Sequence, residues 1–280
     1  MDKLILNTKQ NPIVYTFYVG FFNIFVALFI PFINFALPNA KTFIWIILEA
    51  GVYLLGLYLM YIAINKFDVS KVVTTIGATQ PILIFIFTWI FFGAQIISPK
   101  IIFAFAVLLV GSILISGEKN IKLSSDYLKI TLLASLMFSL DYIFSKFVFL
   151  SMTFWQGFIW MRIFIFLLSL LFLISIKNRK VIFTKKVIAE KKVGVIFGLN
   201  QMFGGGANIL QSFAIFLATP AFLPIINSLR GIQYVFLFLL TLFFSVFLPK
   251  ILKEEISKTA IAIKIISIIL IAVGLALLVL

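Results

Sequence analysis

The sequence contains no cysteine and no histidine, and few of its residues are charged. Without cysteine the chain has neither disulfides nor thiol chemistry, and without histidine it lacks the commonest proton relay and zinc ligand. Charged residues make up 11% of the 280, and only nine residues are acidic. Because an enzyme needs a positioned acid, base, nucleophile or metal, we expect a protein that is not an enzyme and that binds no metal or cofactor.

Hydrophobic residues, by contrast, make up 63% of the chain, and the mean hydropathy is +1.22. A soluble domain carries about a quarter charged residues, so we expect lipid to be the solvent for most of this chain. In lipid each backbone group needs a partner within its own segment, which predicts an all-α integral membrane protein. Nine apolar segments are long enough to cross roughly 30 Å of hydrocarbon, and we predict transmembrane helices at 12–36, 42–64, 71–93, 99–116, 128–150, 152–176, 193–217, 219–247 and 259–280.

The net charge is +14, and the basic residues cluster between the apolar segments. This placement is typical of interfacial anchors and topology signals rather than of a nucleic-acid surface, and the basic run at 177–192 also suits anionic lipid headgroups. One side carries most of the cations, whereas the other has only Lys41, Lys100 and Lys146. By the positive-inside rule the N-terminus is cytoplasmic and, after nine crossings, the C-terminus is outside. We expect a multi-pass protein of the cell membrane that contacts the lipid bilayer and has no nucleic-acid partner.

The second half of the chain repeats the first. Pro99-Lys100 recurs 150 positions later as Pro249-Lys250, and Val110-Gly111 recurs as Val273-Gly274. Internal repeats are typical of transporters, because matched halves create a site between them. The duplication therefore favours a transporter.

The two predicted repeats, 1–118 and 127–280, differ in their number of helices. The second has five and the first has four. Lys146, near the end of the helix that opens the second repeat, corresponds to Lys3 at the start of the chain. We therefore expect the opening helix of the first repeat to be missing, either because the gene product is truncated or because the protein works with nine helices.

Several short motifs resemble one family in their order and spacing. Residues 63–70 (Ala-Ile-Asn-Lys-Phe-Asp-Val-Ser) resemble a junction that closes a third helix, and Thr79-Gln80-Pro81 follows like a fourth-helix proline. Residues 92–95 (Phe-Gly-Ala-Gln) resemble the Leu-Gly-Glu-Arg turn of that family without its acid and base, and residues 160–164 contain an Arg-Ile-Phe like its second-helix Arg-Phe. Together these motifs resemble the EamA family of the drug/metabolite transporter superfamily.

The resemblance implies a ten-helix carrier, made of two inverted five-helix repeats, that moves small organic metabolites such as amino acids. In this chain the first of the ten helices would be missing. The family arginine is present at Arg162 but is replaced by Val19 in the first repeat. The family also keeps both termini cytoplasmic, which disagrees with the charge distribution for the C-terminus.

Polar residues inside apolar segments are the candidates for a substrate cavity, because ionisable groups in the membrane are costly and face a cavity or a partner by default. Glu49 and Asn200 fall at matching positions of the two repeats, and so do Gln80 and Arg230. We hypothesise that Asp141 pairs with Arg230, or alternatively with Lys146 or Arg162. The full set of candidate cavity residues is Glu49, Gln80, Asp141, Asn200, Gln201, Asn208, Gln211 and Arg230.

The segment 193–217 is the most polar of the nine, and its polar residues share one helical face. Three successive glycines, 204–206, weaken a helix and allow close backbone approach. They predict a broken helix that lines a cavity; the alternative is tight helix packing. Prolines at Pro81, Pro220 and Pro224 are candidate helix hinges.

The function that we expect is secondary active transport of small organic metabolites, with Glu49 and Asp141 as candidates for proton coupling. Two alternatives remain open at the level of sequence. One is a flippase for lipids or lipid-linked substrates, since related small carriers move lipids. The other is a membrane subunit that transports nothing.

Overall fold

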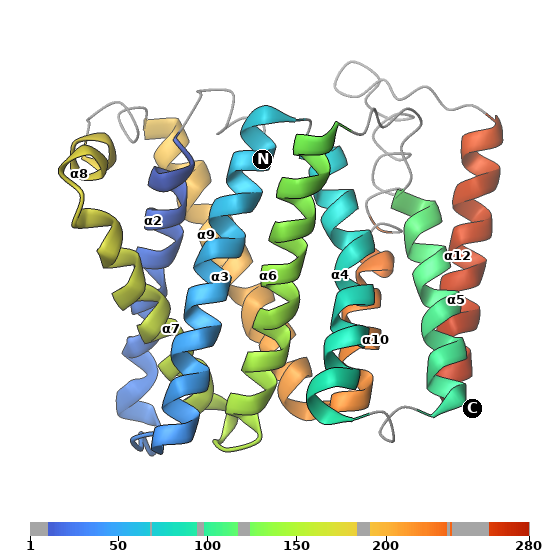
Figure 1. Ribbon diagram of the computed structural model, residues 1–280, viewed down its shortest axis with the longest axis horizontal. Coiled ribbons are helices and arrows are strands. Elements are labelled where there is room, and N and C mark those ends of the chain that lie inside the picture. Colours follow the sequence, from blue (N-terminus) through green and yellow to red (C-terminus); the bar gives the residue numbers. More distant parts are fainter. Residues whose placement is uncertain are drawn as a thin grey trace. The chain divides into compact units, whose positions relative to one another are not determined.

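The computed structural model describes residues 11–67, 69–93, 98–116, 124–183, 191–233, 236 and 258–279 (Figure 1). Within these ranges every regular element is a helix, which confirms the all-α prediction. By length and composition, five of the described helical segments can cross a membrane: Pro12–Phe32, Ala40–Lys66, Thr75–Phe92, Ser125–Phe149 and Phe154–Leu173. Two shorter apolar helices cover Pro99–Gly111 and Ile265–Gly274. These helices support a membrane-embedded protein.

The chain divides into two compact units. Unit 1 comprises Met1–Val72 and Leu123–Ala218, and unit 2 comprises Val73–Lys122 and Thr219–Leu280. Each unit therefore combines a stretch from each half of the sequence. The predicted repeats at 1–118 and 127–280 are not themselves the compact units, because helices from both repeats pack together in each unit.

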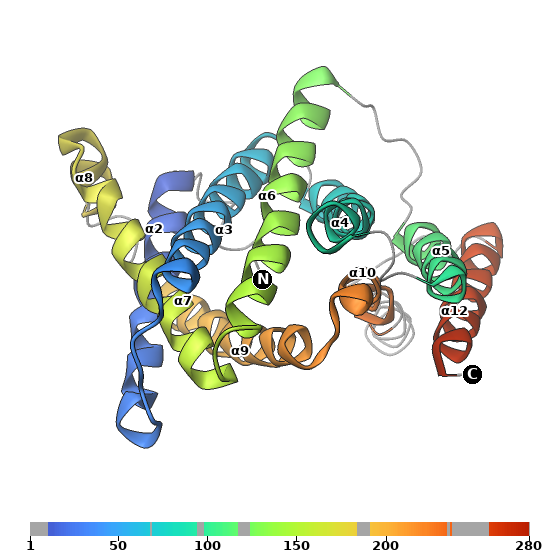
Figure 2. The same cartoon turned by 60° about the horizontal axis from the view of Figure 1, so that its bottom comes forward.

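Unit 1 is built around α3, which lies along α6 and also contacts α2 and α7 (Figures 1 and 2). Its described elements are α2 (Pro12–Phe22), η1 (Asn23–Phe32), α3 (Ala40–Lys66), α6 (Ser125–Phe149), α7 (Phe154–Leu170), η3 (Leu171–Leu173), α8 (Ile176–Ile182) and α9 (Lys191–Leu217). The first four residues of α4 (Val69–Phe92) also belong to this unit.

Local sequence explains where the principal helices of unit 1 begin. The Asn39 side chain accepts a hydrogen bond from the Thr42 amide at 2.8 Å, and the Ser124 hydroxyl accepts one from the Tyr127 amide at 3.2 Å. Both are N-cap interactions, which satisfy amides that the first helical turn leaves unpaired. The short loop between α6 and α7 then brings the end of one helix and the start of the next to the same end of unit 1.

In unit 2, the described elements are most of α4, then α5 (Pro99–Ser116), η4 (Pro220–Phe222), α10 (Leu223–Ser228) and α12 (Lys258–Val279). Its closest helix pair is α5 and α12, which lie side by side and antiparallel (Figures 1 and 2). A Cβ added at Gly111 would lie 2.9 Å from Ile271 Cγ1, and one added at Gly274 would lie 2.6 Å from Leu108 Cγ. The contact is thus reciprocal: each helix presents a glycine to a buried aliphatic residue that precedes the other glycine by three positions.

Most predicted segments correspond to described helices, with ends that differ by a few residues. The segment predicted at 12–36 ends as a 3₁₀ helix at Phe32, one residue after Pro31. The segment predicted at 152–176 ends with η3, and residues 176–182 form the separate α8. The segment predicted at 219–247 is described only in its first part, where η4 and α10 are short consecutive pieces. The total of nine crossings stays a prediction.

Candidate functional site

Unit 1 buries three charged side chains together, one from each of three helices. Glu49 is on α3, Asp141 on α6 and Arg162 on α7, and all three are buried. At 1.5 Å per residue, Glu49 lies about 14 Å from the start of α3, and Arg162 lies about 12 Å from the start of α7. These depths place the charges well inside apolar helices, where an ionisable group is costly unless it is compensated.

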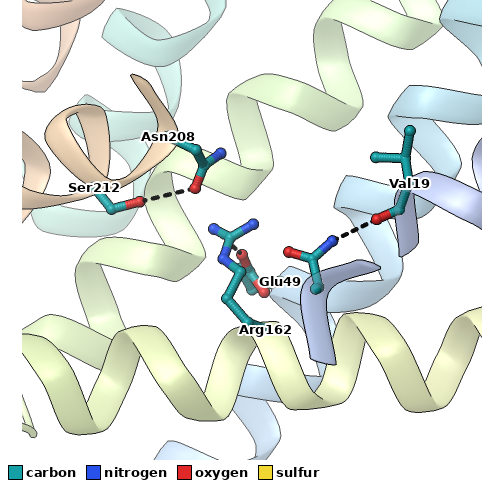
Figure 3. Close-up of polar contacts among 6 residues, drawn as sticks. Val19, Glu49, Arg162, Asn208 and Ser212 are labelled. Carbon is teal, nitrogen blue, oxygen red and sulfur yellow. Dashed lines mark hydrogen bonds and ion pairs between the residues drawn. The ribbon is translucent and has the colours of Figure 1, made fainter. Parts of the chain in front are cut away.

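Arg162 is the base of this cluster (Figure 3). Its Nη2 lies 3.7 Å from Glu49 Oε1. The guanidinium carbon lies 5.3 Å from the centroid of the Tyr53 ring and 5.0 Å from that of Phe158. Stacking on aromatic rings stabilises a guanidinium that has left water. The two rings therefore help to hold Arg162 beside the acids.

The carboxyl groups of Glu49 and Asp141 interact electrostatically with each other within this cluster. Neither oxygen of Glu49 receives a hydrogen bond from an N–H or hydroxyl group among the described residues. Two ionised carboxylates beside one guanidinium would leave a net negative charge in a buried site, and one proton on the pair removes it. With that proton the cluster has one negative and one positive charge, which is the least costly balance for a buried site.

Lys146, one turn and a half further along α6, is also buried. Its Nζ donates to the carbonyl oxygens of Ile215 and Phe216 at 3.2 and 3.0 Å. These carbonyls belong to the last turn of α9, where a cation is favoured by the helix dipole and by unpaired carbonyl groups. Lys146 therefore ties α6 to the end of α9 and does not act as the interfacial anchor that the sequence suggested.

The candidates on α9 are less enclosed. Asn208 accepts a hydrogen bond from the Ser212 hydroxyl at 3.5 Å (Figure 3), and Gln201 and Gln211 are partly exposed. The side chain of Asn200 lies outside the described residues, so its predicted match with Glu49 stays a prediction.

The predicted break at Gly204–Gly206 is wrong, because α9 runs unbroken from Lys191 to Leu217. A broken helix would leave backbone groups without partners, and in lipid this costs more than the roughly 1 kcal/mol by which each glycine weakens a helix. A Cβ added at any of the three glycines would meet no described atom within 4 Å, so the alternative of tight packing at these glycines stays a prediction.

Unit 2 brings Gln80 and Arg230 into contact. Arg230 Nη1 donates to Gln80 Oε1 at 2.7 Å. The sequence had matched these two positions across the repeats, and the structure joins them directly. Asp141 neighbours Glu49 within unit 1, and its hypothesised pairing with Arg230 of unit 2 stays a prediction.

The three hinge candidates occupy different kinds of position. Pro81 lies inside α4, directly after Gln80. Pro220 and Pro224 lie in the first turns of η4 and α10, where proline is tolerated because the amide it lacks would have no helical partner. Only Pro81 therefore removes a hydrogen bond from within a helix.

Three buried residues were missing from the sequence-based site. Arg162 was singled out by the family resemblance, and its position within an apolar segment was the signal that could have placed it in the cavity. Lys146 was read as an anchor because it lies near a helix end. Asn227 is fully buried in α10, and the only sequence signal that could have identified it was a polar residue within an apolar stretch.

No family model matches this sequence, and no curated protein matches it. The EamA resemblance therefore rests on the order and spacing of the short motifs and on the duplication.

Proposed function

We propose that this chain is a secondary active transporter of small organic metabolites, coupled to protons, in a cell membrane. The observation that carries the proposal is the buried cluster of Glu49, Asp141 and Arg162 inside apolar helices. Ionisable groups at this depth mark proton or substrate pathways by default. A cluster kept only for stability would satisfy its polar atoms, yet the Nε of Arg162 and both oxygens of Glu49 accept or donate no conventional hydrogen bond among the described residues.

An architecture of two inverted repeats is supported by unit 2. In a two-fold contact, equivalent residues exchange partners, so that i meets j on one side and j meets i on the other. Leu108 and Gly111 on α5 meet Gly274 and Ile271 on α12 in this manner, and the two glycines belong to the repeated Val-Gly motif. The equivalent residues Gln80 and Arg230 also contact each other. We propose a nine-helix form of the EamA architecture on these grounds.

Proton coupling follows from the charge balance of the cluster. When the shared proton leaves, two carboxylates face one guanidinium, and the net negative charge is costly to keep away from water. The deprotonated state is therefore favoured in a conformation that opens the cluster to water, and the protonated state in one that closes it. A ligand that binds one conformation better shifts the equilibrium toward it, which is the requirement for coupling.

The test is solute uptake by the full chain in proteoliposomes with an imposed pH gradient. A panel of radiolabelled amino acids provides the solutes, and fluorescent lipids in the same vesicles report lipid translocation. We expect Glu49→Gln and Asp141→Asn each to abolish the dependence of uptake on the gradient, since an amide cannot release a proton. Thr131→Val is the matched control, because Thr131 is equally buried on α6 and bonds only to backbone carbonyls of its own helix.

Gradient dependence that is unchanged in both carboxyl variants would exclude coupling through this pair. Lipid translocation without amino-acid uptake would identify a flippase instead. An absence of both fluxes would favour the non-transporting subunit.

A further inference from the structure

Unit 2 contains a buried positive charge that no described acid compensates. The acidic residues in its sequence are Glu118, Glu254 and Glu255, and all three lie outside the described residues. Arg230 is partly buried, and it donates a hydrogen bond to the neutral amide oxygen of Gln80. A guanidinium has five N–H donors in a planar fork. Among the described residues, Gln80 accepts from one of these donors and supplies no charge.

A second polar group lies three positions before Arg230 in the sequence. Asn227 is fully buried, and neither its Oδ1 nor its Nδ2 has a hydrogen-bond partner among the described residues. Ile225, on the same short helix, makes apolar contacts with Phe105 and Leu108. A buried amide without a partner is costly, which indicates that another group completes its hydrogen bonds.

The backbone is interrupted between these two residues. Helix α10 ends at Ser228, Leu229 forms a turn, and residues 230–233 are helical again. Short, discontinuous helices carry the substrate sites of many transporters, because side chains and backbone groups beside the break remain available to a ligand. Asn227 and Arg230 are on either side of the break.

We infer that Arg230 and Asn227 bind the carboxylate group of the transported solute, and that Gln80 positions the guanidinium. This inference rests on the proposed transport function and names its substrate class as organic acids, amino acids included. A carboxylate matches the planar fork of arginine in a two-bond geometry, and its single charge balances one guanidinium. A dianionic phosphate group would leave a net negative charge among apolar helices.

The experiment measures equilibrium binding to the purified full chain in lipid nanodiscs. The probes are leucine and 4-methylvalerate, each compared with its primary amide. For the wild-type chain we expect the acid of each pair to bind at least ten-fold more tightly than its amide, since only the acid compensates Arg230. Arg230→Gln should weaken acid binding at least ten-fold and leave amide binding unchanged. Arg230→Lys should lose less affinity for the acids, because lysine retains the positive charge but lacks the planar guanidinium that binds a carboxylate through two hydrogen bonds.

Two further variants separate the site from general effects on unit 2. Asn227→Leu should weaken acid binding several-fold, since it removes one donor and keeps the buried volume similar. Thr88→Val is the matched control: Thr88 is another fully buried residue of unit 2 whose hydroxyl has no partner among the described residues. We expect it to leave the affinity for acids unchanged.

Equal affinities of the wild-type chain for acid and amide, or no binding of either acid, would overturn the inference. Unchanged acid binding by Arg230→Gln would overturn the inference as well. If Arg230→Gln does not fold, Asn227→Leu provides an independent test. Acid-selective binding without uptake in proteoliposomes would reject the transport function and keep the site. If uptake depends on the pH gradient but wild type and Arg230→Gln bind the acids with equal affinity, the transport function stands and the site at Arg230 is rejected.

Discussion

The two units bury opposite balances of charge. Unit 1 holds two carboxyl groups and one guanidinium in mutual contact, so its acids outnumber the base that faces them. Unit 2 holds a guanidinium that donates a hydrogen bond to one amide, and its described residues include no acid. One proton would balance the charges of the first site, whereas no described acid balances Arg230 in the second. Under the function that we propose, the coupling proton would bind in unit 1 and the carboxylate of the solute in unit 2.

The largest effect that we predict is a loss of stability when the base of unit 1 is removed. Arg162→Gln leaves the carboxyl pair without its positive partner, and breaking a buried ion pair costs about 3–5 kcal/mol. Arg230→Gln in unit 2 should cost less than about 1 kcal/mol, because its partner is neutral and the side chain is only partly buried. Thermal unfolding of the three proteins in one detergent measures the difference.

A double variant checks that the loss at Arg162 is electrostatic. Neutralising the acid in Glu49→Gln/Arg162→Gln should recover part of the stability, since neighbouring substitutions in one network are not additive. If Arg162→Gln and Arg230→Gln unfolded at the same temperature, the contrast between the two units would be wrong.

A medium effect is expected at the second buried cation of unit 1. Lys146→Met keeps the volume of the side chain but leaves the carbonyl groups of Ile215 and Phe216 without their donor. An unsatisfied buried acceptor costs about 1–3 kcal/mol, and the loss of a buried charge offsets part of this. Hydrogen exchange should show faster exchange in the last turn of α9 and no change in α12. Equal protection of α9 in both proteins would contradict the role of Lys146.

Apolar composition and length were sufficient to predict the class of fold and most helix ends, because lipid selects long helices whatever their packing. Side-chain partners were not predictable, since they depend on how helices rotate against one another. Arg162 meets Glu49 only because α3 and α7 pack in one register. Likewise, the position of Lys146 near a helix end suggests an interfacial anchor. Its bonds to the last turn of α9 become apparent only in the folded structure.

The glycines show the same limit most clearly. The three consecutive glycines of α9 were the more conspicuous pattern, yet no described residue lies within 4 Å of a Cβ added at any of them. The isolated Gly111 and Gly274 were noticed only as a repeated Val-Gly motif, and these two form the close contact of α5 with α12. The effect of glycine on helix propensity can be predicted from the local sequence. The close approach of two helices at a glycine depends on which helix packs against it.

The smallest effect that we predict tests this difference in packing between the units. In unit 2, Gly274→Ala would place a methyl group 2.6 Å from Leu108 Cγ and 3.1 Å from the Leu108 amide nitrogen. Overpacking costs about 1–3 kcal/mol, and alanine regains about 1 kcal/mol of helix propensity, so we expect a net loss of about 1 kcal/mol. In unit 1, Gly205→Ala has only the gain in propensity, because its Cβ meets no atom within 4 Å. Thermal unfolding should therefore move in opposite directions in the two variants. A loss of stability in Gly205→Ala would mean that the open face of α9 is covered in the membrane, and no change in Gly274→Ala would mean that α5 and α12 can separate without cost.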